Sequence, residues 1–127
     1  MSGNVLRLTP QNFELFSGAD KYLNVTVRDK NNQVVDLTGA TITWALSRTP
    51  KSTKLVEYTS PVDIIILDPA TEGKFQVQIK NADTEALKGG TRAKPEMYYH
   101  EARVQSAAGL RTPVMYGDVE LLNNLIE

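Results

Sequence analysis

The sequence contains no cysteine and only one histidine among its 127 residues. The lack of cysteine excludes a disulfide-stabilised scaffold, thiolate metal sites and cysteine catalysis, and one histidine cannot form a histidine-rich metal cluster. Gly 8 and Pro 6 are too few for a low-complexity chain, and a hydrophobic content of 41% is too high for a disordered one. The composition therefore indicates a globular domain.

Long apolar runs and an excess of one charge are also missing. The longest strongly apolar run, Ile64–Leu67, is far shorter than the roughly 20 residues of a membrane span. The N-terminal residues have no basic head followed by an apolar core, so we expect no secretory signal and synthesis in the cytoplasm. A net charge of -1 argues against general nucleic-acid binding, which needs a concentrated basic surface. We expect one domain over residues 1–127, with no cofactor, membrane or nucleic-acid partner.

Hydrophobic alternation with a period of two dominates the chain and is typical of half-buried β-strands. Turn residues separate these segments about every ten residues. About seven such strands predict an all-β fold, an immunoglobulin-like antiparallel β-sandwich, with one short helical region near residues 81–88. The predicted core consists of the inward-facing residues of the strands: Val25, Val27, Ile42, Trp44, Leu46, Phe75, Val77, Ile79, Tyr98 and Val104.

Two features predict irregularities between or within the strands. Gly117, inside the last predicted strand, indicates a bulge or a bend. Ser60-Pro61 interrupts an extended stretch, because proline cannot donate a ladder hydrogen bond. If this break bends one strand, the loops at residues 48–54 and 88–96 share one end of the sandwich. If it separates two antiparallel strands, the loops lie at opposite ends.

A catalytic site needs an acid, base or nucleophile beside groups that tune it. His100 is the only imidazole, and its neighbour Glu101 points to the opposite face of a regular strand, so the two cannot form a dyad. We expect a core histidine satisfied by a hydrogen bond. The scattered carboxylates lack the alternating spacing of a calcium loop: Asp63, Asp68, Glu72 and Asp83. The sequence therefore predicts neither an enzyme nor a metal site.

Aromatic side chains offer a second kind of site, because exposed rings can stack on sugars. Trp44 alternates with apolar neighbours, which favours a place in the core. We expect Tyr98 to donate a corner hydrogen bond to the preceding loop, as sandwiches often do. Tyr99 falls on the opposite face. An exposed Tyr99 or Tyr58 is the expectation if the protein binds glycans.

Basic residues concentrate in two predicted loops and form a candidate docking surface for an acidic partner. One group flanks residues 48–54 and the other flanks residues 88–96, and both groups are equally compatible with solvated loops that have no partner. Their members are Arg48, Lys51, Lys54, Lys88, Arg92 and Lys94.

The N-terminal segment 1–12 carries Leu6 and Leu8 in a polar context. They belong either to an arm that adds a strand to a neighbour's edge or to the first strand of their own sandwich, and we favour the second interpretation. The last residues, 123–127, form a C-terminal tail, the other candidate docking segment.

The order of several segments resembles one known family. These segments are Phe16–Asp20, Leu23–Asp29, Val35–Trp44, Asp68–Phe75, Asp83–Leu87, Tyr98–Val104 and Val114–Val119. They resemble the bacteriophage baseplate-upper-protein N-terminal domain family and related small tail and neck proteins, from about Phe13 to Leu122. The run from Val35 to Thr41 is the most distinctive part.

This resemblance implies an immunoglobulin-like module that attaches one virion component to another without catalysis. Longer members continue into helical or receptor-binding regions, so no independent receptor-binding role is expected for a chain ending at Glu127. The expected function is a structural adaptor of a tailed phage virion, placed in several symmetric copies between tail, baseplate, fibre, neck or capsid components. The alternative is a capsid-surface decoration protein of the same fold that adheres to glycans.

Overall fold

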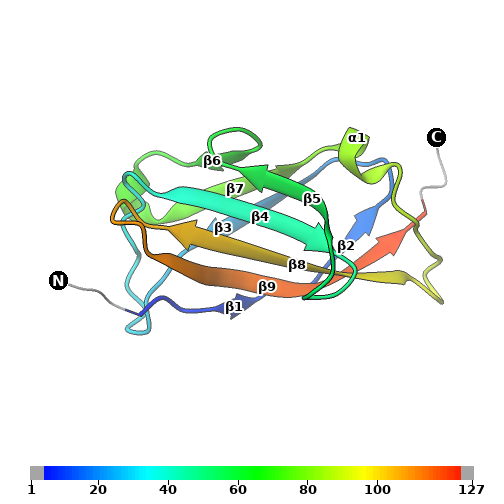
Figure 1. Cartoon of the computed structure of the whole chain (residues 1–127), viewed down its shortest axis with the longest axis horizontal. Helices are drawn as coiled ribbons and strands as arrows, with labels where there is room; N and C mark the ends of the chain where they lie inside the picture. The colour runs from blue at the N-terminus through cyan, green and yellow to red at the C-terminus, as the bar shows by residue number, and fades with distance from the viewer. Residues whose placement is uncertain (1–4, 124–127) are drawn as a thin grey trace.

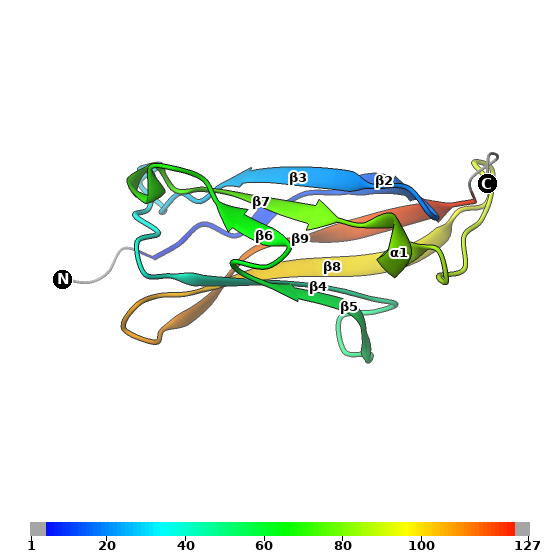
Figure 2. The ribbon, with the colours of Figure 1, turned by 90° about the horizontal axis from the view of Figure 1, so that it is seen from above.

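Two β-sheets lie face to face and enclose the core in the computed structural model, which describes residues 5–123 (Figures 1 and 2). The larger sheet has the order β1-β9-β8-β4-β5, with β2 also paired to β9, and the smaller has the order β3-β7-β6. The strands of the larger sheet are β1 (Thr9–Pro10), β2 (Phe13–Phe16), β4 (Thr41–Ser47), β5 (Lys54–Thr59), β8 (Glu96–Gln105) and β9 (Arg111–Leu122). Those of the smaller sheet are β3 (Lys21–Thr26), β6 (Ile64–Ile66) and β7 (Lys74–Ile79).

Two short helical turns accompany the strands. The 3-10 turn η1 spans Ala70–Glu72 between β6 and β7, and helix α1 spans Asn81–Thr84 between β7 and β8. Helix α1 lies inside the region predicted to be helical. Within residues 5–123, no helix is long and apolar enough to span a membrane.

The strand order is that of an immunoglobulin-like β-sandwich, so the predicted fold class is confirmed. Trp44 lies buried on β4, and Tyr98 lies near the start of β8. These are the places where immunoglobulin domains carry their core tryptophan and their corner tyrosine. The described residues form nine strands rather than about seven, because the N-terminal segment adds β1 and β2 as two separate pieces.

One edge of the larger sheet departs from the expected antiparallel pattern. Both β1 and β2 pair in parallel with β9, with Thr9 opposite Met115 and Phe13 opposite Val119. The chain then crosses from β2 to β3 in the other sheet, so a hairpin does not determine the direction of this edge. Leu15 on β2 is 1% exposed, and its burial helps to fix the register.

All ten residues predicted for the core are buried. Alternation explains this outcome on β7, where Phe75, Val77 and Ile79 face inward and the intervening glutamines face outward. β8 behaves in the same way, with its even-numbered residues from Tyr98 to Val104 all buried. The core also includes residues outside the predicted set, among them Leu15, Ile64, Met115 and Leu121.

Gly117 does not mark the bulge that its position suggested. The register shift between β8 and β9 lies at Ala102/Arg103, while Gly117 pairs regularly with His100. A Cβ atom at Gly117 would lie 2.2 Å from the carbonyl oxygen of Gln11. The glycine is therefore required because the N-terminal segment crosses β9 closely at this point.

The break at Ser60-Pro61 separates strands of different sheets, which neither predicted alternative included. β5 belongs to the larger sheet and β6 to the smaller one, and only an isolated bridge between Thr59 and Val62 spans the crossing. In the turn before β4, Gly39 has a φ of 74°, and the Asp36 carboxylate accepts hydrogen bonds from the backbone and hydroxyl of Thr38.

Candidate interaction surface

The two basic loops lie at the same end of the sandwich. The first, residues 48–54, leads from β4 into β5, and the second, residues 88–96, leads into β8. Ser47 at the end of β4 pairs with Tyr99 near the start of β8, so the register brings the loops together (Figure 1). We call this end of the molecule, defined by both loops, the loop pole.

Arg48 connects the two loops within one molecule. Its guanidinium forms an ion pair with Glu96 at 3.0 Å and lies 4.5 Å from the centroid of the Tyr98 ring. The hydrogen bond from Arg48 lowers the pKa of the Glu96 carboxyl, and the positive charge of Lys88 acts in the same direction. Arg48 therefore contributes to the shape of the loop pole, in addition to its charge.

Tyr98 anchors the second loop from below. Its hydroxyl donates a hydrogen bond of 2.8 Å to the backbone carbonyl of Lys88. This is the predicted corner hydrogen bond to the preceding loop, and it is confirmed. The loop is further fixed at Gly90, which exchanges backbone hydrogen bonds with Leu121 and Asn123.

Two of the predicted docking cations have loose ion pairs. Lys54 lies 3.1 Å from Glu57, and Arg92 lies 3.5 Å from Glu14. All four side chains are largely exposed, with 60% for Lys54 and 73% for Arg92, so each pair contributes about 0.5 kcal/mol or less. These cations can exchange their partner for another carboxylate at little cost.

Three further cations of the predicted set carry free charge. Lys51, Lys88 and Lys94 are exposed, and within residues 5–123 the structure gives none of them an ion-pair partner. Lys51 lies on the first loop, and the other two lie on the second. The loop pole therefore presents positive charge from both loops.

The N-terminal segment runs along its own sandwich from Val5 onward. Leu6 forms a β-bridge with Asp29 and packs against the core, whereas Leu8 is 46% exposed just before β1. Backbone hydrogen bonds join Arg7 to Arg28 and Lys30 to Val5. Residues 1–4 of the proposed arm and 124–127 of the tail lie outside the described residues.

His100 is a core residue with both ring nitrogens hydrogen-bonded. The Trp44 indole donates to Nδ1 at 3.1 Å, so Nε2 carries the proton and donates to the Gln11 carbonyl at 2.6 Å. Burial lowers the pKa of the imidazole, although the bond to Gln11 opposes this effect. The side chain is 0% exposed, which closes it to a substrate. Its role is structural: it links β4, β8 and the N-terminal segment.

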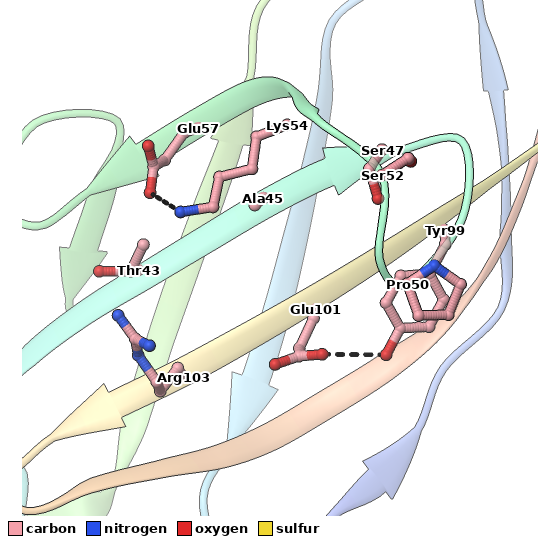
Figure 3. A pocket seen from close by; sticks show the side chains of 10 residues that line it. All are labelled: Thr43, Ala45, Ser47, Pro50, Ser52, Lys54, Glu57, Tyr99, Glu101 and Arg103. Atoms are coloured by element: carbon pink, nitrogen blue, oxygen red, sulfur yellow. Dashed lines mark hydrogen bonds and ion pairs between the residues drawn. The ribbon is translucent and has the colours of Figure 1, made fainter.

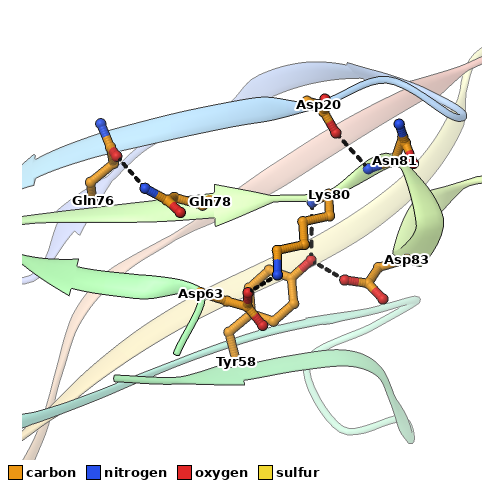
Figure 4. A network of polar contacts seen from close by, with 8 residues as sticks. All are labelled: Asp20, Tyr58, Asp63, Gln76, Gln78, Lys80, Asn81 and Asp83. Carbon is orange, nitrogen blue, oxygen red and sulfur yellow. Dashed lines mark hydrogen bonds and ion pairs between the residues drawn. The ribbon is translucent and has the colours of Figure 1, made fainter. Parts of the chain in front are cut away.

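Two of the acidic residues considered for a calcium loop, Asp63 and Asp83, are engaged in other contacts. The Tyr58 hydroxyl donates to Asp83 at 2.6 Å and accepts a hydrogen bond from the Lys80 backbone, while the Lys80 side chain pairs with Asp63 (Figure 4). Residues 5–123 contain no group of three or more histidine, cysteine, aspartate or glutamate side chains suited to a metal ion. This network fastens β5 to helix α1.

Tyr58 is therefore not the exposed ring expected for a glycan site. It is 5% exposed and stacks on Trp44 with 5.5 Å between ring centroids. Burial and the hydrogen bond to Asp83 raise the pKa of its hydroxyl. The Tyr58 ring can be buried because its hydroxyl donates a hydrogen bond to Asp83, which lies on helix α1.

Tyr99 occupies the outer face of the larger sheet. It is half-buried, lines the same hollow as Pro50 of the first loop and donates a hydrogen bond of 3.0 Å to Glu101 (Figure 3). Partial burial and the Glu101 carboxylate raise the pKa of Tyr99 to about 12. A hollow of about 150 Å³ lies beside these residues and also includes Arg103.

Sequence reasoning missed three residues of this outer face. Met97 is 45% exposed, Tyr116 is 37% exposed, and Asp118 is also exposed. Together with Tyr99 they line a second hollow between β8 and β9, bordered by Pro50. Continuing the alternation through the last strand would have placed Tyr116 and Asp118 outward.

Comparisons with known proteins give no functional assignment. The sequence matches no protein-family model and no curated protein. Among solved structures, it is similar to murine CRIg, with 13% sequence identity, a TM-score of 0.42, and coverage of 94% of this chain and 98% of that chain.

Proposed function

We propose that the protein is a non-enzymatic structural adaptor of a tailed bacteriophage virion, present in several copies and docked between tail, baseplate, fibre, neck or capsid components. The sequence resemblance between about Phe13 and Leu122 supports this function. Synthesis in the host cytoplasm and incorporation into the particle are parts of the proposal.

The observation that carries the adaptor role is the loop pole. A rigid sandwich presents Lys51, Lys88 and Lys94 from two loops whose backbones are fixed by Tyr98 and Arg48. A fixed array of cations favours association with an acidic surface, because binding then costs little conformational entropy for ordering the loops. We propose an acidic patch on a neighbouring virion protein as the partner of this pole.

Quantitative mass spectrometry of density-purified particles from the source of the sequence tests the virion assignment. The expected result is a fixed ratio to the portal or tail proteins, whose value distinguishes a ring from a capsid shell. Absence from clean particles would exclude a virion component and leave an assembly factor as the better explanation.

Charge reversal tests the loop pole separately. Lys88→Glu and Lys94→Glu are expected to reduce incorporation into particles, because each replaces a positive charge that would face the acidic partner by a negative one. Within residues 5–123, neither lysine forms an ion pair that the substitution would also break. Lys30→Glu, in the exposed turn after β3, is the matched control and should leave incorporation unchanged. Equal incorporation of all three variants would rule out docking through this pole.

A glycan-adhesive capsid decoration protein is the second candidate. Tyr99 and Tyr116 lie on the same outer face, beside polar groups of Glu101 and Asp118, which is a suitable surface for stacking on sugars. Binding on a glycan array that is lost in Tyr116→Ala but kept in Tyr22→Ala, which removes an exposed ring from the other sheet, would favour this function. An array without signal would eliminate it.

A further inference from the structure

One row of residues across the outer face of the larger sheet carries opposite charges at its two ends. Ser47 pairs with Lys54 on one side and with Tyr99 on the other, and Tyr99 pairs with Asp118. The row therefore reads Lys54, Ser47, Tyr99, Asp118 from β5 to β9. Within residues 5–123, Lys54 has a single ion pair, the exposed one with Glu57, and the Asp118 carboxylate has none.

The next row repeats this asymmetry with a carboxylate and a phenol. Ala45 pairs with Glu57 on β5 and with Glu101 on β8, and Glu101 pairs with Tyr116 on β9. Glu57 can accept a hydrogen bond, and the hydroxyl of Tyr116 can donate one. The two edges of the face are again complementary to each other.

The relief of the face comes from one loop and one hollow. The loop between β4 and β5 projects outward from the larger sheet, away from the sandwich (Figure 2). The hollow is lined by Met97, Tyr116 and Asp118 on β8 and β9, and Pro50 of the same loop borders it. Tyrosine and methionine are enriched at the centres of protein interfaces.

We propose that two copies of this chain pack through the outer face of the larger sheet about a two-fold axis that runs along the strands, between β4 and β8. Such an axis places the β5 side of each copy opposite the β9 side of the other copy. It keeps each residue at the same position along the strand direction, so residues of one row face residues of the same row. Lys54 of one copy then faces Asp118 of the second copy, and Glu57 faces Tyr116.

A second copy fits this face better than an unrelated protein because both halves of the contact are present on one chain. In an isologous interface, if residue i of one copy contacts residue j of the other, then residue j of the first copy also contacts residue i of the second. The two rows satisfy this requirement. The near-zero net charge of the chain also leaves little overall repulsion between copies. The dimer contact uses Lys54 of the first loop but neither Lys88 nor Lys94 of the second loop, whose reversal tests the loop-pole contact with another protein, and it does not depend on a phage origin.

Sedimentation equilibrium of the full chain tests the dimer from about 1 μM to about 1 mM, the Kd range of weak interfaces. We expect a dimer that weakens at high salt. Lys54→Glu and Asp118→Lys should each raise its Kd at least about tenfold, because each places like charges opposite one another twice. An equimolar mixture of these two variants, and the double variant, should both recover the dimer, because both contacts are then of opposite sign.

Lys74→Glu is the matched control, since Lys74 lies on β7 of the other sheet and its side chain is 53% exposed. This variant should dimerise like the unaltered chain, and far-UV circular dichroism should show all variants to be folded. A monomer over the whole concentration range would overturn the proposal. So would a dimer that is insensitive to both charge reversals, or a mixture of the two variants that fails to associate.

Discussion

Trp44 and His100 are joined by a hydrogen bond of 3.1 Å in the middle of the core, from the indole Nε1 to Nδ1 of the imidazole. The opposite ring nitrogen binds the Gln11 carbonyl, so one buried imidazole couples β4 to the N-terminal segment that lies against β9. His100 lies two positions after Tyr98, where antibody domains carry the second cysteine of their core disulfide. The His100 hydrogen bonds, however, join elements of the larger sheet and do not bridge the two sheets as that disulfide does.

Stability should therefore fall as the pH drops below about 6.5. The unfolded chain takes up a proton at the ordinary histidine pKa of 6.5, whereas burial keeps the pKa of folded His100 lower. Between these two values the unfolded state binds more protons, so the free energy of unfolding rises with pH and is fully developed above 6.5. Urea unfolding at several pH values between about 5.5 and about 7.5 measures this dependence.

His100→Gln is the control for this pH dependence. It should be less stable than the unaltered chain at neutral pH, because it disrupts two buried hydrogen bonds, but its stability should be nearly flat over the same pH window. The carboxyl groups with lowered pKa values, Asp36 and Glu96, lose their contribution only at lower pH. An unaltered chain with flat stability across the window would contradict the assignment.

Tyr98→Phe should destabilise the protein by about 1 kcal/mol, because it removes the hydrogen bond to the Lys88 carbonyl but keeps the ring beneath Arg48. Amide hydrogen exchange should accelerate in residues 88–96 more than in the strands. Tyr99→Phe is the matched control, since its hydroxyl bonds an exposed carboxylate, and it should change stability by less than about 0.5 kcal/mol. Equal effects of the two substitutions would argue against the anchoring role of Tyr98.

Tyr58→Phe should cost about 1 to 2 kcal/mol, since the Tyr58 hydroxyl both donates to Asp83 and accepts from the Lys80 backbone amide. The stacking of the ring on Trp44 is kept, so the loss reports on the hydrogen bonds. Urea unfolding of Tyr58→Phe, Asp83→Asn and the double variant measures the coupling between the two side chains. Additive losses would show that the contact between β5 and helix α1 contributes nothing.

The sequence predicts those parts of the fold in which the polarity of each side chain indicates whether it is buried or exposed. Alternation identified β7 and β8 because inward and outward positions differ in every pair of residues. The turn at Asp36 to Gly39 was also predictable, since side-chain hydrogen bonds and a positive φ are local properties. Local patterns thus account for the strands, the turn and the core.

Contacts between distant segments explain what the sequence did not predict. The parallel pairing of β2 with β9 joins residues more than a hundred positions apart, and no turn fixes its direction. The sequence placed Arg48 among the docking cations, because its ion-pair partner, Glu96, lies on the other loop and is distant in sequence. Tyr58 is buried because Asp83, on helix α1, accepts the hydrogen bond of its hydroxyl, a partner that the neighbouring sequence does not reveal. In the candidate surface, charge was predictable from sequence but the pairing of charges was not.

Gly117→Ala should destabilise the protein by roughly 2 to 3 kcal/mol, because the added methyl group would meet the Gln11 carbonyl at 2.2 Å and a carbonyl carbon at 2.7 Å. These are backbone atoms that no side-chain rotation can move away, so the N-terminal segment must shift. The shift also weakens the hydrogen bond from His100 to the Gln11 carbonyl.

Gly109→Ala provides the comparison for this substitution. In the part of the chain that the structure describes, no atom lies within 4 Å of a Cβ at Gly109, so its φ of 93° is what opposes the alanine, at a cost of about 1 kcal/mol. Urea unfolding of both variants, with proteolysis of residues 5–12 as a local readout, separates steric displacement from backbone strain. The displaced segment in Gly117→Ala should be cleaved faster, whereas Gly109→Ala should be cleaved like the unaltered chain. Equal protection of the segment in both variants would show that Gly117 is not the position that holds the N-terminal strand against β9.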